Sequence, residues 1–217
     1  MIYKFEPPCG EHILHYSAYF IFLSGKTISN SFLQFKLLYR MSGNYGCYCF
    51  QVGWFICIAS VKYDQEILAL CFCGILVGLH FLFSLARSMD LKLSLIGLLI
   101  GLVIDSTLQY VSVISFYGWA LGPLSPFWLW MIWVMFALTL NSSLSFLQSK
   151  HVFLSAIAGL IFGPLSYLAG VKLGAAGFDN TLPHLVTIGL IWTLVLPALV
   201  HFAKNSHSPS QDTHDAT

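Results

Sequence analysis

Long apolar stretches alternate with short polar breaks along most of the chain. Each stretch is close to the roughly 20 residues that a helix needs to cross a hydrocarbon core. A backbone in lipid must satisfy its own hydrogen bonds, and these runs are too long and too uniformly apolar for barrel strands. The pattern predicts an all-α fold, a polytopic membrane helix bundle of about six transmembrane helices. The predicted spans are 45–61, 67–86, 91–112, 126–147, 151–172 and 184–203.

The composition agrees with a membrane protein. The 217 residues are 57% hydrophobic and 9% charged, and the mean hydropathy is +0.77. An average soluble domain carries about 25% charged residues, which it needs to cover its surface. A formal net charge of +1 excludes the clustered Lys and Arg of a nucleic-acid-binding protein. We therefore expect membrane lipids as partners, other membrane proteins as a second class of partner, and no nucleic acid.

The first forty residues differ from the rest of the chain. Their longest apolar run, 13–24, is too short to span a bilayer, and acidic rather than basic residues precede it, unlike in a signal peptide. Because Met41 directly precedes the first span, we interpret it as an alternative start and residues 1–40 as an untranslated extension. The alternative is a genuine cytoplasmic or interfacial segment. The membrane domain is then 41–204, and residues 205–217 are predicted to be a disordered polar tail.

The distribution of Lys and Arg predicts the orientation, since cytoplasmic loops carry more of them. With both termini in the cytoplasm, the outer side receives only Lys62 and Lys172. If residues 1–40 are left out, the bias falls to four against two. The cytoplasmic side receives Lys26, Lys36, Arg40, Arg87, Lys92, Lys150 and Lys204.

Glycines spaced four apart recur in or beside the spans. Such pairs allow the backbones of neighbouring helices to approach closely, although glycine is also simply common in membrane helices. The pattern favours a compact bundle of the second, third and fifth helices. Pro164 removes one amide from the fifth span and is expected to kink it near Leu160. The pairs are Gly74 and Gly78, Gly97 and Gly101, Gly159 and Gly163, and Gly170 and Gly174.

Two groups of polar residues are predicted within the spans, one in the outer half of the membrane and one in the inner half. Asp105 is the clearest candidate, because an ionisable residue inside the membrane is costly. In one interpretation Asp105 is protonated or paired with Tyr167 or Lys172, and His80 and Asn141 tie helices together. In the other, the outer group lines a polar cavity for a lipid head group or small solute. The outer group is Asp105, Gln109, Ser166, Tyr167 and Lys172, and the inner group is Gln51, His80, Asn141 and Ser142.

No catalytic motif, cofactor site or metal site is predicted. The chain has no H-E-x-x-H pair, G-x-S-x-G elbow or P-loop. Four of its six cysteines form two C-x-C pairs. Residues two apart lie about 200° around a helix, so neither pair converges on one metal. We interpret the cysteines as small apolar packing residues.

Three segments suggest a family. The chain resembles the bacterial membrane family catalogued as domain of unknown function 2878. The resemblance covers residues 45–203, including Asp105-Ser106, and implies a small multi-pass protein of the bacterial inner (plasma) membrane without supplying an activity. Histidine commonly follows the asparagine of the span-four motif in the family, whereas Ser142 stands here. The segments are Phe50-Gln-Val-Gly-Trp-Phe55, Leu138-Thr-Leu-Asn-Ser-Ser-Leu144 and Gly163-Pro-Leu-Ser-Tyr-Leu-Ala-Gly-Val-Lys-Leu-Gly-Ala175.

Three functional hypotheses remain open. The resemblance implies genes for fatty-acyl modification beside members of the family, which favours an accessory role in the modification or handling of membrane lipids. A small-solute transporter is the first alternative and predicts a water-accessible path past Asp105. An intramembrane enzyme is the second, and Asp105 with Tyr167 or Lys172 is its only candidate catalytic pair.

Overall fold

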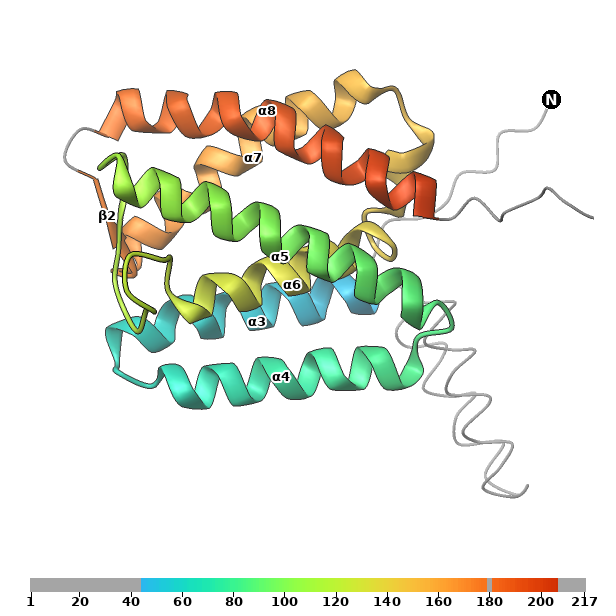
Figure 1. Ribbon diagram of the computed structural model, residues 1–217, viewed down its shortest axis with the longest axis horizontal. Coiled ribbons are helices and arrows are strands. Elements are labelled where there is room, and N and C mark those ends of the chain that lie inside the picture. Colours follow the sequence, from blue (N-terminus) through green and yellow to red (C-terminus); the bar gives the residue numbers. More distant parts are fainter. Residues whose placement is uncertain (1–43, 179–180, 207–217) are drawn as a thin grey trace, which may run out of the picture. The chain divides into compact units, whose positions relative to one another are not determined.

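The computed structural model describes residues 44–178 and 181–206 (Figure 1). The interpretations of residues 1–40 and of most of the polar tail lie outside these ranges. Helix α8 continues to Ser206, two residues into the predicted tail. The helices within the described ranges are α3 (Asn44–Lys62), α4 (Glu66–Phe83), α5 (Arg87–Tyr110), α6 (Phe127–Leu140), α7 (Val152–Lys172) and α8 (Thr181–Ser206).

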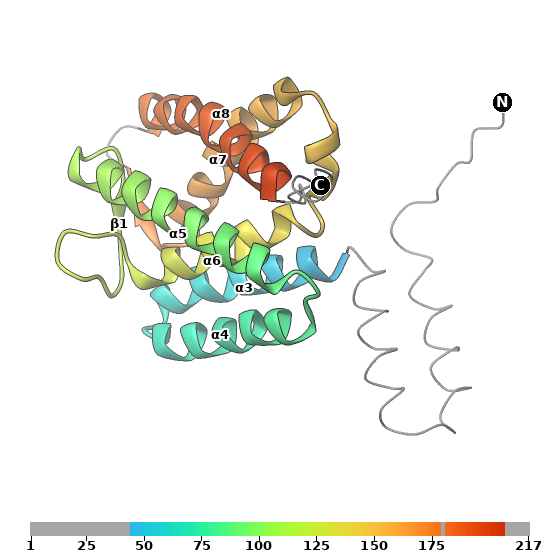
Figure 2. The same cartoon turned by 45° about the vertical axis from the view of Figure 1, so that its right-hand side comes forward.

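The helices are arranged as three layers of antiparallel pairs. Figures 1 and 2 show α3 beside α4, α5 beside α6, and α7 beside α8, with the α5–α6 pair in the middle. Successive helices cross the bundle in opposite directions, and the connections from α3 to α4 and from α4 to α5 are only three residues long. The predicted all-α helix bundle is therefore confirmed.

Helix α6 lies at the centre and packs against α3, α4, α5 and α8. Its 14 residues span about 21 Å, less than the roughly 30 Å of a hydrocarbon core. The predicted span 126–147 was too long, because the helix ends at Leu140 and the chain continues as a turn and the 3-10 helix η1 (Ser145–Ser149). Polar side chains bond the last carbonyls of α6: Ser142 Oγ donates to Leu138 O at 3.0 Å, and Gln148 Nε2 donates to Leu140 O at 2.8 Å.

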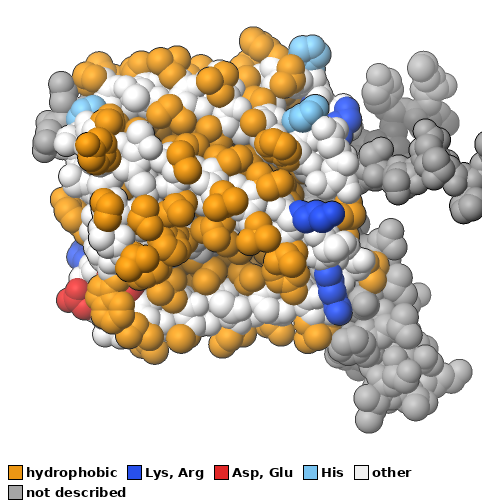
Figure 3. Space-filling view, viewed as in Figure 1, with side chains coloured by type: hydrophobic (Ala, Val, Ile, Leu, Met, Phe, Trp, Pro, Cys, Tyr) orange, Lys and Arg blue, Asp and Glu red, His pale blue; other side chains and the backbone are white. Residues whose placement is uncertain are grey.

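Four helices are long and apolar enough to cross a membrane: α4, α5, α7 and the Leu182–Ser206 part of α8. The apolar helices Cys47–Lys62 and Phe127–Leu140 are shorter. In Figure 3 hydrophobic side chains cover the middle of the visible face, and Lys and Arg side chains gather at the end drawn on the right. An apolar surface of this extent is what a lipid-facing protein presents.

Two loops are joined by a small strand pair that was not predicted. The strands β1 (Ser115–Phe116) and β2 (Ala176–Gly177) are antiparallel and link the α5–α6 loop to the α7–α8 loop. In the same α5–α6 loop, Gly118 has φ +106° and faces the buried carboxylate of Glu66. A Cβ at this position would lie 2.7 Å from Glu66 Oε2, so both the backbone and the contact require glycine.

The glycine pairs of α5 and α7 pack against α6 and α8, not against each other or α4 as predicted. A Cβ on Gly97 would lie 2.7 Å from Ala137 Cβ of α6, and one on Gly159 would lie 2.1 Å from the backbone oxygen of Trp192 of α8. The prediction of a compact group of the second, third and fifth helices is therefore wrong. Glycines spaced four apart indicate that another helix packs closely there. When all faces of a span are apolar, the sequence does not show which helix that is.

The two other glycine pairs do not mediate helix contacts. Gly74 and Gly78 are exposed on α4, and a Cβ on either would meet no described atom within 4 Å. Gly174 has φ +87° and ends α7, where its amide donates to Val171 O at 3.0 Å. A Cβ on Gly170 would also meet no described atom within 4 Å, although Gly170 is buried.

These contacts predict that substitution by alanine changes the free energy of unfolding differently at Gly159 and at Gly78. Gly159→Ala should lower the free energy of unfolding in detergent by about 1–3 kcal/mol, because the added Cβ overlaps a backbone oxygen that cannot rotate away. Gly78→Ala is the matched control and should be neutral or stabilising by up to about 1 kcal/mol, since alanine favours helix. Thermal or denaturant unfolding of both variants measures the difference, and equal effects would contradict this account of α7 and α8.

Candidate functional site

Asp105 of α5 is fully buried and joins three helices. The Tyr167 hydroxyl of α7 donates to Asp105 Oδ1 at 2.5 Å, and the Trp133 indole Nε1 of α6 donates to Oδ2 at 2.7 Å. Of the two partners considered from the sequence, the structure brings Tyr167 to Asp105. Lys172 is exposed, and no ion pair among the described residues joins it to Asp105.

The remaining members of the predicted outer group lie apart from the carboxylate. Ser166 Oγ donates to Gly163 O at 2.7 Å within its own helix. Gln109 Oε1 is buried and has no hydrogen-bond partner in the described part of the chain. The hydrogen-bonded centre therefore consists of Asp105, Tyr167 and Trp133 rather than of the predicted polar group.

Trp133 and Trp192 stack beside Asp105. Their ring centroids are 5.2 Å apart and their planes differ by 12°. Glycines face both rings: a Cβ on Gly101 would lie 2.1 Å from Trp133 Cγ, and one on Gly163 would lie 2.3 Å from Trp192 Cγ. The Asp105 carboxylate orients the Trp133 indole, and Gly101 and Gly163, which have no side chains, leave space for the two rings.

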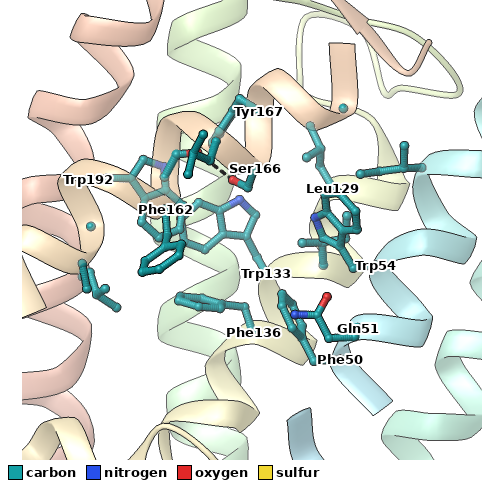
Figure 4. A pocket seen from close by; sticks show the side chains of 18 of the residues that line it. Phe50, Gln51, Trp54, Leu129, Trp133, Phe136, Phe162, Ser166, Tyr167 and Trp192 are labelled. Carbon is teal, nitrogen blue, oxygen red and sulfur yellow. Dashed lines mark hydrogen bonds between the residues drawn. The ribbon is translucent and has the colours of Figure 1, made fainter. Parts of the chain in front are cut away.

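A cavity of about 500 Å³ adjoins this centre. Its walls come from α3 and α7, its floor from α6, and further lining from α8 (Figure 4). It extends from Leu144 and Leu147 at one end of the bundle to Phe116 and Ala176 at the other. Its aromatic lining includes Phe50, Trp54, Trp133, Phe136, Phe162 and Trp192.

The cavity opens sideways between α3 and α7. Among its lining residues, Phe162 is 67% exposed and Leu165 is 52% exposed. Phe162 lies midway along α7, which runs from Val152 to Lys172. In a protein whose α7 crosses the bilayer, this opening faces the hydrocarbon of the lipid rather than water.

The cavity is apolar, contrary to the polar cavity considered from the sequence. Asp105 does not line it, and the polar side chains of its lining are Gln51, Ser166 and Tyr167. Tyr167 and Ser166 already donate their hydroxyl hydrogens to protein acceptors. Asp105 thus acts on the cavity indirectly, by fixing Trp133 and Tyr167 in its wall.

A second polar cluster at the other end of α5 centres on Asp90. Asp90 Oδ2 accepts from Ser84 Oγ at 2.6 Å and lies 3.0 Å from His80 Nε2, while Asn141 Nδ2 donates to Oδ1 at 2.9 Å. His80 of α4 and Asn141 at the end of α6 are thereby tied together. Two other residues of the predicted inner group lie elsewhere, since Gln51 lines the cavity and Ser142 bonds backbone carbonyls.

The sequence interpretation missed Asp90, Trp133 and Trp192. A usable signal existed for Trp133, because a buried indole N–H requires an acceptor and Asp105 is the only acidic residue in the interior of the predicted spans. Asp90 falls in a polar break, and its position there did not indicate whether its side chain faces the bundle. The same signal fails for Trp192, whose buried indole N–H has no hydrogen-bond partner in the described part of the chain and whose ring contacts aromatic residues distant in sequence.

Comparisons with known proteins give one match. The family model described as protein of unknown function (DUF2878) matches residues 45–198. Neither the curated proteins nor the solved structures contain a match to the chain.

The hydrogen bonds of Asp105 predict different outcomes for two substitutions. Asp105→Leu should lower the free energy of unfolding by about 2–5 kcal/mol, because two buried donors lose their acceptor. Asp105→Asn should cost about 1 kcal/mol, because its Oδ1 still accepts from Trp133 and its amide can donate to the Tyr167 oxygen. Unfolding in detergent, followed by near-UV circular dichroism, measures both effects.

Thr107→Leu is the control, since Thr107 is exposed on the same helix. It should leave the unfolding midpoint unchanged. Equal destabilisation by Asp105→Asn and Asp105→Leu would mean that charge, rather than hydrogen-bond acceptance, is what the centre needs.

Proposed function

This chain belongs to the DUF2878 family of proteins of unknown function, and we propose that it handles membrane lipids by taking one hydrocarbon chain into the apolar cavity between α3 and α7. We call this cavity the groove. The observation that carries the proposal is the lateral opening of an apolar cavity at the middle of α7, marked by the exposed Phe162 and Leu165. A hydrocarbon chain can enter such an opening directly from the bilayer. A water-soluble solute would first have to cross the hydrocarbon.

The size and chemistry of the cavity support this occupant. Its volume of about 500 Å³ lies within the range of roughly 300–1,000 Å³ found for ligand pockets. Lipid tails are as apolar as leucine, so a chain leaving the bilayer gains little from the hydrophobic effect. Binding must come from closer packing, and the rigid rings of Trp54, Trp133 and Phe136 offer it.

The two alternatives from the sequence lack a comparable observation. A transporter for small solutes would need polar groups along a path, and Gln51, Ser166 and Tyr167 are the polar side chains among the lining residues. An intramembrane enzyme would need a reactive pair that reaches the cavity, and Asp105 does not line it. A role as accessory to an enzyme that modifies fatty-acyl chains fits a protein that holds such a chain.

We also propose that the protein lies in the bacterial inner membrane with both termini in the cytoplasm. Arg87, Lys92, Lys150 and Lys204 belong to one end of the bundle, where α4 and α6 end and α5 and α7 begin. Lys62 and Lys172 belong to the other end. A four-to-two excess of Lys and Arg supports a cytoplasmic position for the first end.

The groove predicts the result of a lipid-labelling experiment. A phospholipid with a photoreactive diazirine in its acyl chain should label wild-type residues that line the groove. Gly170→Leu should reduce this labelling by about tenfold, equivalent to about 1.4 kcal/mol, because its side chain would project into space that is now empty. Gly74→Leu is the matched control, since its Cβ also meets nothing but lies on α4, outside the groove. Unchanged labelling in Gly170→Leu, or labels spread over all lipid-facing helices, would reject the proposal.

The orientation predicts the behaviour of reporter fusions. Green fluorescent protein fused after the last residue should fluoresce, and alkaline phosphatase at the same place should be inactive. Phosphatase inserted in the α5–α6 loop at Leu121, which is exposed, should be active. The reverse pattern would invert the orientation and leave the groove proposal untouched.

A further inference from the structure

Three sulfur-bearing side chains from three helices belong to one buried cluster in the interior of the bundle. Cys57 Sγ of α3 lies 3.5 Å from Cys73 Sγ of α4. Met135 of α6 approaches the same place: a Cβ on Gly53 would lie 2.6 Å from Met135 Sδ and 3.4 Å from Cys73 Sγ. All three side chains belong to one buried cluster, with exposures of 0%, 0% and 5%. None of the three sulfur-bearing side chains lines the groove, although other members of the same cluster, such as Ile58 and Leu129, do.

The absence of a side chain at Gly53 leaves the space that Met135 Sδ occupies, next to Cys73. Gly53 is buried, and its carbonyl oxygen lies 3.7 Å from Cys73 Sγ. The two thiols are free rather than joined in a disulfide. The two thiols contact each other, Cys73 Sγ also faces the Gly53 carbonyl oxygen, and both side chains otherwise pack among apolar residues.

We propose that Cys57, Cys73 and Met135 form a binding site for one copper(I) ion. Thiolate and thioether are soft ligands, and together they favour Cu(I) over the harder divalent metals. Zinc sites are built from four Cys, His or carboxylate ligands, and no group of three or more His, Cys, Asp or Glu residues that could hold a metal is present in the described part of the chain.

The charge of the ion also matches the site. The surroundings are apolar, and an uncompensated charge there is expensive. When Cu(I) binds, one thiol loses its proton, and the resulting thiolate neutralises the single positive charge. A divalent ion would require both thiols to ionise. The proton leaves the protein, so binding should release about one proton per copper.

A route to the site is present on α3. Cys49 lies eight residues before Cys57, with Gly53 between them, so the three residues occupy one face of the helix. Cys49 is partly buried and Cys47 is exposed, both near the beginning of α3. The Cys49 thiol offers an exchange point between the end of the bundle and the buried sulfurs.

Anaerobic titration of the purified full-length protein in detergent with Cu(I), against a chromophoric Cu(I) chelator, tests the proposal. The wild type should retain about one tightly held ion, with only sulfur in its first coordination shell by X-ray absorption. Cys57→Ser combined with Cys73→Ser should abolish this binding, and Met135→Leu should weaken it by more than about tenfold, since even second-shell changes at metal sites cost 10–100-fold. Cys47→Ser combined with Cys71→Ser is the control, because both thiols are exposed.

The outcomes separate a metal site from packing of small apolar side chains. Copper retention that survives loss of Cys57 and Cys73, or that disappears in the Cys47 and Cys71 control, overturns the proposal. If the double serine variant does not fold, the wild type decides alone: nitrogen or oxygen in the first shell, or no retained ion, overturns it. Gly53→Ala provides a further variant, because its Cβ would displace Met135 Sδ and should weaken binding as Met135→Leu does.

Discussion

The hydrogen bonding of one buried carboxylate fixes the middle of this bundle. Asp105 is enclosed by protein, and its two oxygens accept from Tyr167 and Trp133, so α5, α6 and α7 are held at one point. In lipid no water can replace either partner. The orientation of Trp133 then positions Trp192 by stacking, and both rings form part of the groove wall. A polar interaction that touches no ligand thus shapes an apolar site.

Close packing complements this interaction by placing large rings where glycine provides space. Gly101 faces Trp133, and Gly163 faces Trp192. Because aliphatic side chains gain no hydrophobic advantage by leaving lipid for protein, such contacts depend on shape and dispersion. The bundle is tight where glycine meets tryptophan and open between α3 and α7, and the opening is where we place the hydrocarbon chain.

The sequence predicted the features that depend on hydrophobic length. The helical class and the long apolar helices followed from the apolar runs. Asp105 was singled out because an ionisable group in lipid is costly, and its side chain is fully buried. Contacts between helices did not follow, because a helix that is apolar all round does not indicate which face meets a neighbour. Tyr167 and Lys172 were therefore equal candidates for the partner of Asp105, and the structure pairs it with Tyr167. Gly74 was expected in a helix contact but is exposed, and Asp90 was assigned to a polar break but is buried. Only a tertiary arrangement distinguishes them.

The shortness of α6 has a consequence for the surrounding bilayer. No residue of α6 is exposed, but exposed residues follow it at Ser145 and Phe146, at a depth where a full-length helix would still be crossing the hydrocarbon core of a bilayer. Lipids at this position must shorten or tilt to match, at a cost of fractions of a kcal/mol per ångström of mismatch. The protein should therefore thin one leaflet locally and partition toward thinner membrane regions, where lipids with short or bent chains reduce that elastic strain.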